Sequence, residues 1–115
     1  MRKMLAALIA VALSVPMAAL AETWEKVPLI DQMCAKKEKV TAHPENHPVG
    51  CLIKCSGSGY GVMTGAGKYL KFDEAGNKKA LAMLKETKKE NDVRVNVTGE
   101  KHGDTIKVAS LKMAD

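Results

Sequence analysis

Two runs near the C-terminal end of the chain alternate between apolar and polar residues. Valines occupy every second position of the first run, within residues 93–98, and this period of two predicts a half-buried β-strand. A second run over residues 105–113 has the same period but loses its phase near the middle. A β-bulge at Ala109 or Ser110 would return the apolar side chains to the core, because one extra residue restores the alternation. The two runs flank a glycine-containing turn, so we expect a hairpin.

Three shorter apolar runs predict the remaining strands. The first, residues 22–33, contains Pro28, which cannot donate a hydrogen bond to a neighbouring strand, so we expect a short or edge strand. The other two, residues 60–64 and 69–73, flank the glycine-rich segment 65–68 and predict a second hairpin.

Helices are predicted in two places. Residues 77–89 are rich in good helix formers, present an apolar face and begin at Asn77, a residue type that caps helix N-termini. A helix of about two turns is predicted over residues 48–55, because Pro48 suits a first turn and a Ser/Gly run follows. The preceding segment, residues 35–47, is charged and proline-containing, so we expect a polar loop there.

This order gives five strands, with a helix between the third and the fourth strand. A sheet of this size has unpaired edges unless it closes on itself, and the order of elements is that of a small OB-like barrel. We therefore predict a mainly β, α+β fold in which residues 22–115 form a single OB-like domain with a short cysteine-bearing helix. A flat α+β sheet built from the same elements is the competing architecture.

The first segment of the chain differs from the rest. Residues 1–21 contain Arg2 and Lys3, then an apolar stretch, and then Ala19-Leu20-Ala21, which are the three parts of a secretory signal peptide. We expect cleavage after Ala21 and a protein located in the periplasm or secreted, where disulfides persist. No later run reaches the roughly 18 to 20 apolar residues of a membrane span, so we expect no membrane association after cleavage.

Removing this segment changes the charge of the protein. The formal net charge of the 115-residue chain is +5, and it falls to +3 without the two basic residues of segment 1–21. This small charge and an aromatic content of 3% argue against nucleic-acid binding, which uses basic surfaces and stacking aromatic side chains. The glycine-rich segments suit turns rather than phosphate-binding loops, and no pattern of nucleophile, base and acid indicates a catalytic site. We therefore expect a binding protein rather than an enzyme, with a metal ion as its ligand and a protein as a further candidate partner.

Three cysteines and one histidine form the strongest chemical pattern. Cys34 follows the first strand, and His47, Cys51 and Cys55 are each four residues apart. On a helix this spacing places Cys51 and Cys55 on one face, with His47 at the helix start, and the loop after Cys34 can return that residue to them. Three thiolates and one imidazole are a ligand set for tetrahedral Zn(II) or for Cu(I). With four protein ligands, the predicted site serves a structural, storage or transfer role.

The same residues allow other arrangements. In an oxidising compartment Cys34 could form a disulfide with Cys51 or Cys55, which would make the protein a disulfide-stapled binding or adaptor module without a metal. A strained redox disulfide between Cys51 and Cys55 is a further alternative. His43 could replace His47 as the histidine ligand.

The chain resembles a group of small exported bacterial proteins of unknown function. In that group a first strand ends in Cys, a His and a Cys-x3-Cys follow, and two hairpins come after them. The matching hairpin segments here are VMTGAGKYL at residues 62–70 and VRVNVTGEKHGDTIKVASL at residues 93–111. The resemblance implies an OB-type barrel and a metal or disulfide role for the Cys/His set. Pro28 and the Ala/Gly-rich turn at residues 65–68 depart from the pattern of the group.

Overall fold

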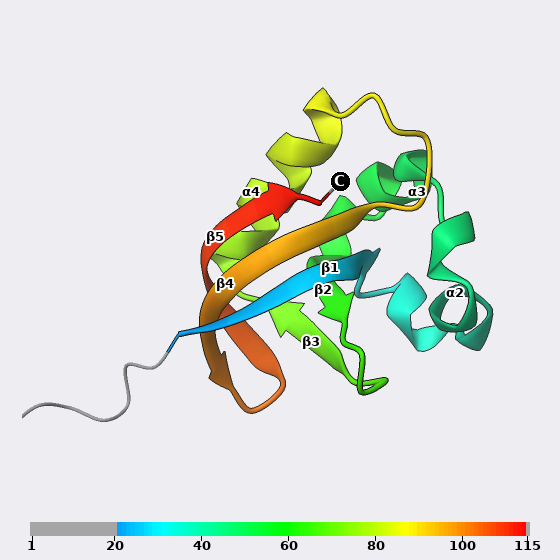
Figure 1. Cartoon of the computed structure of the whole chain (residues 1–115). Coiled ribbons are helices and arrows are strands. Elements are labelled where there is room, and N and C mark those ends of the chain that lie inside the picture. Colours follow the sequence, from blue (N-terminus) through cyan, green and yellow to red (C-terminus); the bar gives the residue numbers. More distant parts are fainter. Residues whose placement is uncertain (1–20, 115) are drawn as a thin grey trace, which may run out of the picture.

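The chain forms a five-stranded closed β-barrel in the computed structural model, which describes residues 21–114 (Figure 1). The predicted signal peptide, residues 1–21, therefore lies outside the described residues except for Ala21. The barrel strands are β1 (Glu22–Asp31), β2 (Tyr60–Met63), β3 (Tyr69–Phe72), β4 (Arg94–His102) and β5 (Thr105–Met113).

The strands pair around the barrel in the order β1-β2-β3-β5-β4, and β1 also pairs with β4. Neighbouring strands are antiparallel except for β3 and β5, which are parallel. Helix α4 (Glu74–Glu86) connects β3 to β4. The predicted OB-like barrel with a helix between its third and fourth strands is confirmed. The alternative flat sheet is wrong, because closure gives each of the five strands two neighbours and leaves no open edge within residues 21–114.

The chain between β1 and β2 carries the other helices and is called the insertion below. In Figure 1 it lies to the right of the barrel, whereas α4 lies behind β5. The predicted short helix is present as α3, but the predicted polar loop over residues 35–47 is wrong. That segment forms short helical turns. The one over residues 38–42 ends before His43, because Pro44 disfavours a helical backbone in the residue that precedes it. The elements of the insertion are η1 (Cys34–Lys36), α2 (Glu38–Ala42), η2 (Pro44–Asn46), α3 (Val49–Lys54) and η3 (Ser56–Ser58).

Helix α4 begins earlier than predicted. Its N-cap is Asp73, whose Oδ1 accepts the N–H of Gly76 at 3.0 Å and the N–H of Val108 in β5 at 3.2 Å. Asn77 lies inside the helix, and its Oδ1 accepts the N–H of Tyr60 at 2.8 Å. The predicted cap at Asn77 is therefore wrong, because its side chain fixes the start of β2 while Asp73 caps the helix.

Strand β1 is neither short nor at an edge, so that prediction is also wrong. It spans 10 residues and pairs with β2 on one side and β4 on the other. Lys26 has a φ of 52°, and the register with β4 shifts just before Pro28. Pairing with β4 resumes at Val27, opposite Val95, and Pro28 lies opposite Arg94. The next N–H, that of Leu29, donates to the Val93 carbonyl at 2.9 Å. This irregularity accommodates a proline, which has no N–H for the ladder.

The second hairpin contains the predicted bulge. Thr98 pairs with Ser110 and Gly99 pairs with Val108, so Ala109 has no partner across the hairpin. The extra residue brings the inward-facing side chains of β5 back into the barrel, where they share one core with α3 and α4. The largest fully buried apolar side chains are Tyr60, Ile30, Leu52, Leu70, Leu84, Ile106, Val62, Val95 and Val97.

Gly61 of β2 occupies a tight point in the barrel wall. A Cβ added there would collide with the carbonyl of Leu70 and with the ring of Tyr69. We expect Gly61→Ala to lower the free energy of unfolding by roughly 1–3 kcal/mol, as overpacking typically does. Urea denaturation followed by circular dichroism measures this. Gly65→Ala is the control, because nothing lies within 4 Å of a Cβ at that turn. Equal losses in the two variants would contradict the packing argument.

Candidate metal centre

Asp31, the last residue of β1, is a fully buried carboxylate with 0% of its surface exposed. The end of the strand is fixed by two tyrosines. Asp31 pairs with Tyr60 of β2, and the hydroxyl of Tyr69 donates to the carbonyl of Ile30 at 2.7 Å. A buried carboxylate is costly unless donors or a cation compensate its charge. The buried carboxylate of Asp31 therefore requires hydrogen-bond donors or a cation beside it.

Two residues of the insertion supply donors to Asp31. The backbone N–H of Cys34 donates to Oδ2 at 2.9 Å, and Nε2 of His47 lies 2.9 Å from Oδ1. An ionised carboxylate only accepts hydrogen bonds, so Nε2 is the donor in this pair when Asp31 is ionised. A carboxylate oxygen, the Cys34 sulfur and a His47 ring nitrogen all lie within 4.8 Å of one another, and all three residues are buried. We call these residues the Asp-Cys-His group.

His47 is held in place by the chain on both sides of it. Its N–H donates to the carbonyl of Pro44 at 3.1 Å and so closes the η2 turn. The next residue, Pro48, is the N-cap of α3 and forms a bridge with Asn91, in the segment before β4. One local contact, with Pro44, and one distant contact, with Asn91, thereby hold the backbone on both sides of an imidazole that is only 6% exposed.

Cys34 begins η1 and is 8% exposed. Burial, the hydrogen bond to Asp31 and the negative charge of Asp31 together raise the pKa of its thiol from 9.0 to about 11. A negative charge on Cys55 raises the same pKa, whereas the positive charge of Lys37 lowers it. With only protons in the group, the Cys34 thiol is therefore neutral near neutral pH.

The structure brings together two of the four predicted ligands, Cys34 and His47. Cys51 is exposed on α3, and Cys55 is the partly exposed C-cap residue of that helix. Neither belongs to the Asp-Cys-His group. All three cysteines are free thiols. Cys55 is nevertheless linked to the segment that carries Cys34, because the hydroxyl of Ser58 donates to the Cys55 carbonyl at 2.9 Å and accepts the N–H of Met33 at 3.2 Å.

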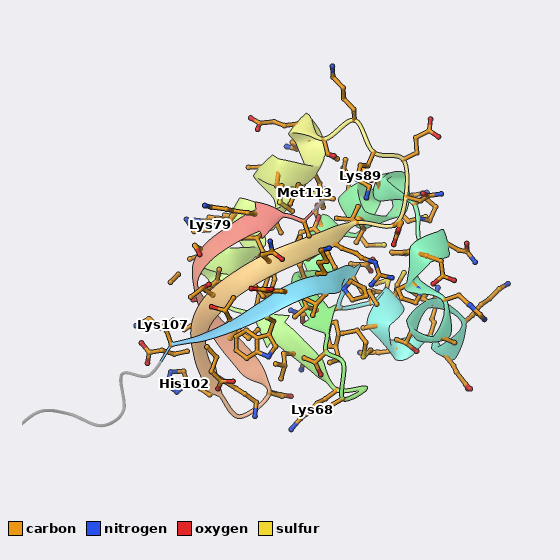
Figure 2. All side chains as sticks on the ribbon, viewed as in Figure 1. Lys68, Lys79, Lys89, His102, Lys107 and Met113 are labelled. Carbon is orange, nitrogen blue, oxygen red and sulfur yellow. The ribbon has the colours of Figure 1, made fainter. Side chains whose placement is uncertain are left out.

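The other two histidines lie outside the buried group. The side chain of His43 is 68% exposed, and its Nδ1 lies 3.2 Å from Glu45. The side chain of His102 is 62% exposed, and Figure 2 shows it near the end of the β4–β5 hairpin, away from α2 and α3. His47, rather than His43, is therefore the histidine placed beside Cys34.

No protein-family model matches the chain, and neither a curated protein nor a solved structure is significantly similar to it. Within residues 21–114, no helix is long and apolar enough to cross a membrane.

The positive charge of four labelled lysines is spread over the molecule, because they lie on different elements in Figure 2: Lys68, Lys79, Lys89 and Lys107.

The three donors differ in chemical hardness. Carboxylate oxygen, imidazole nitrogen and thiolate sulfur are all ligands of Zn(II), which accepts mixed sets in tetrahedral geometry. Cu(I) prefers soft sulfur donors, so the carboxylate makes it the poorer match. A cation in the group would displace the thiol proton and the proton between His47 and Asp31. The group thus offers three of the four positions around a tetrahedral ion.

Asp31 is the residue that the Cys/His spacing does not reveal. The sequence feature that could have indicated it is an acidic residue directly after the apolar pair Leu29-Ile30 and three residues before Cys34. An acid at a strand end is more often solvated. Its burial follows only from the pairing of β1 and β2 and from the return of His47 to the strand end.

In the metal-free, reduced protein at about pH 8, we expect iodoacetamide to modify Cys34 far more slowly than Cys51. A pKa of about 11 in place of 9.0 leaves about a hundredfold less thiolate, and burial restricts access further. Peptide mass spectrometry over a time course gives the rate at each cysteine. The Cys34 rate should rise as the pH approaches 11. Equal rates for Cys34 and Cys51 at about pH 8 would be inconsistent with a buried Cys34 thiol.

Proposed function

We propose that the protein binds a transition-metal ion through Asp31, Cys34 and His47, in the periplasm or outside the cell, and has a structural, storage or transfer role. The observation that carries the proposal is the gathering of three different ligand atoms within 4.8 Å in a buried group. Zn(II) is the favoured ion because it accepts oxygen, nitrogen and sulfur together. Cu(I) is the second candidate.

The burial of the group gives a physical reason for a cation. Asp31 is 0% exposed and His47 is 6% exposed. Hydrogen bonds from the Cys34 backbone and from His47 compensate part of the cost of burying a carboxylate. A divalent cation would compensate it more fully, because its charge balances both the carboxylate and a Cys34 thiolate. The arrangement therefore suits a cation better than it suits protons.

A disulfide-stapled binding or adaptor module is the competing function. Its support is the link through Ser58 between the backbone of Cys55 and that of Met33, the residue before Cys34. Cys51, which is exposed on α3, is the less suitable partner for a buried thiol. A disulfide at Cys34 would remove its sulfur from the ligands of a metal. The two functions therefore exclude each other in a given molecule.

Zn(II) should stabilise the reduced protein against unfolding, because the ion binds the folded state. At a free Zn(II) concentration about 1,000 times the Kd, the gain is about 4 kcal/mol. Cys34→Ser and His47→Gln should each lose most of this gain, since each removes a ligand. His43→Gln should keep it and is the matched control, because His43 lines the same surface pocket as His47 but is 68% exposed. Urea unfolding with Zn(II) or with a chelator measures the difference.

Elemental analysis and intact mass of protein purified without a chelator separate the two functions. Stoichiometric metal with three free thiols agrees with the metal site. The loss of two hydrogen atoms without bound metal agrees with the stapled module. Reduced wild-type protein that neither binds Zn(II) nor gains stability from it would refute the proposed function.

A further inference from the structure

We infer that Cys55 is the fourth ligand of this metal site and that Cys51 is not a ligand. The inference rests on the proposed function, because it assigns the position that the Asp-Cys-His group leaves open on a tetrahedral ion. The two cysteines share one short segment and a four-residue spacing. They differ in what surrounds them.

A serine ties Cys55 to the segment that carries Cys34. The Oγ of Ser58 accepts the N–H of Met33 at 3.2 Å and donates to the carbonyl of Cys55 at 2.9 Å. Met33 directly precedes Cys34, whose own N–H is bound to Asp31. One side chain therefore bridges the backbones on which the two thiols are carried, next to the buried carboxylate.

Cys55 is more accessible to solvent than Cys34. Cys55, Met33 and Ser58 line the same open surface pocket, and Cys55 is partly exposed, whereas Cys34 is buried. The Cys55 sulfur is outside the 4.8 Å group, so its side chain must turn inward to bind.

The end of α3 gives Cys55 a different position from that of Cys51. The helix ends at Lys54, and Cys55 follows as its C-cap with φ −97° and ψ 22°. Cys55 therefore leaves the regular helical geometry and continues into η3, which Ser58 attaches to Met33. Cys51 remains within α3, where its side chain is exposed.

Ligation by Cys55 changes what the site can do. Asp31, Cys34, His47 and Cys55 together give one oxygen, one nitrogen and two sulfur ligands. All four tetrahedral positions are then occupied by protein, and no position remains for the water that a catalytic zinc activates. A closed site of this kind holds the ion for structure, storage or transfer rather than for hydrolysis.

Co(II) is the probe for the test, because it takes ligands similar to those of Zn(II) and gives a charge-transfer absorption for each bound thiolate. Reduced wild-type protein, Cys55→Ser and Cys51→Ser are titrated with Co(II) alone. We expect equal charge-transfer intensity in the wild type and Cys51→Ser, and about half of it in Cys55→Ser. The Co(II) affinity of Cys55→Ser should fall by at least about tenfold, since losing even a group that only orients a ligand costs about 10–100-fold.

The outcomes separate the inference from the proposed function. Equal charge-transfer intensity in wild-type protein and Cys55→Ser would overturn the role of Cys55 and leave the three-residue site in place. A loss of intensity in Cys51→Ser would also overturn the assignment. If the wild-type protein takes up no Co(II), the proposed function and the inference fail together.

A measurement on the wild-type protein removes any dependence on how the variants fold. The rate of iodoacetamide modification at each cysteine is compared with and without Zn(II). We expect Zn(II) to slow the modification of Cys55 by at least about tenfold, because a coordinated thiolate is a poor nucleophile, and to leave Cys51 unchanged. Modification of Cys55 at the same rate in both conditions would overturn the inference.

Discussion

The buried carboxylate of Asp31 is the constraint on which the structure between β1 and β2 depends. It lies at the end of a barrel strand, and the insertion brings two donors to it, one to each oxygen: the backbone of Cys34 and the imidazole of His47. A buried charge that loses its partner typically costs 3–5 kcal/mol. The insertion must therefore return His47 to the barrel if Asp31 is to remain ionised and buried.

This contact also explains how a weakly packed segment keeps one conformation. Helix α2 has only five residues and buries none of them, so the core contributes little to its order. The two ends of the segment, Cys34 and His47, are instead joined through Asp31. Joining the ends lowers the conformational entropy of the chain between them in the way that any loop closure does. A cation at the same place would strengthen this closure, so metal binding and the order of the insertion are coupled.

The sequence predicts the barrel well because each strand shows its own local pattern. The alternation of valines in β4 and the loss of phase in β5 are enough to predict the hairpin and the bulge at Ala109. The errors come from contacts between distant residues. Asn77 resembles a helix cap but binds the backbone of Tyr60, and the site includes Asp31, whose burial depends on pairing with β2. Spacing on one helix suggests a shared role for Cys51 and Cys55, yet only Cys55, at the end of that helix, is tied through Ser58 to the segment that carries Cys34.

The charges around the group bear on whether a second thiolate can be accommodated there. Zn(II) with Asp31, a Cys34 thiolate and neutral His47 is electrically neutral, and a Cys55 thiolate adds one negative charge. Lys37 acts on the group already, since its positive charge lowers the pKa of Cys34, and Lys54 lines the surface pocket that contains Cys55. Cys55 is also partly exposed, so water stabilises much of the extra charge. Water and the nearby lysines can therefore compensate the charge of a fourth, anionic ligand supplied by the partly exposed Cys55. A second thiolate as deeply buried as Cys34 would lack that compensation.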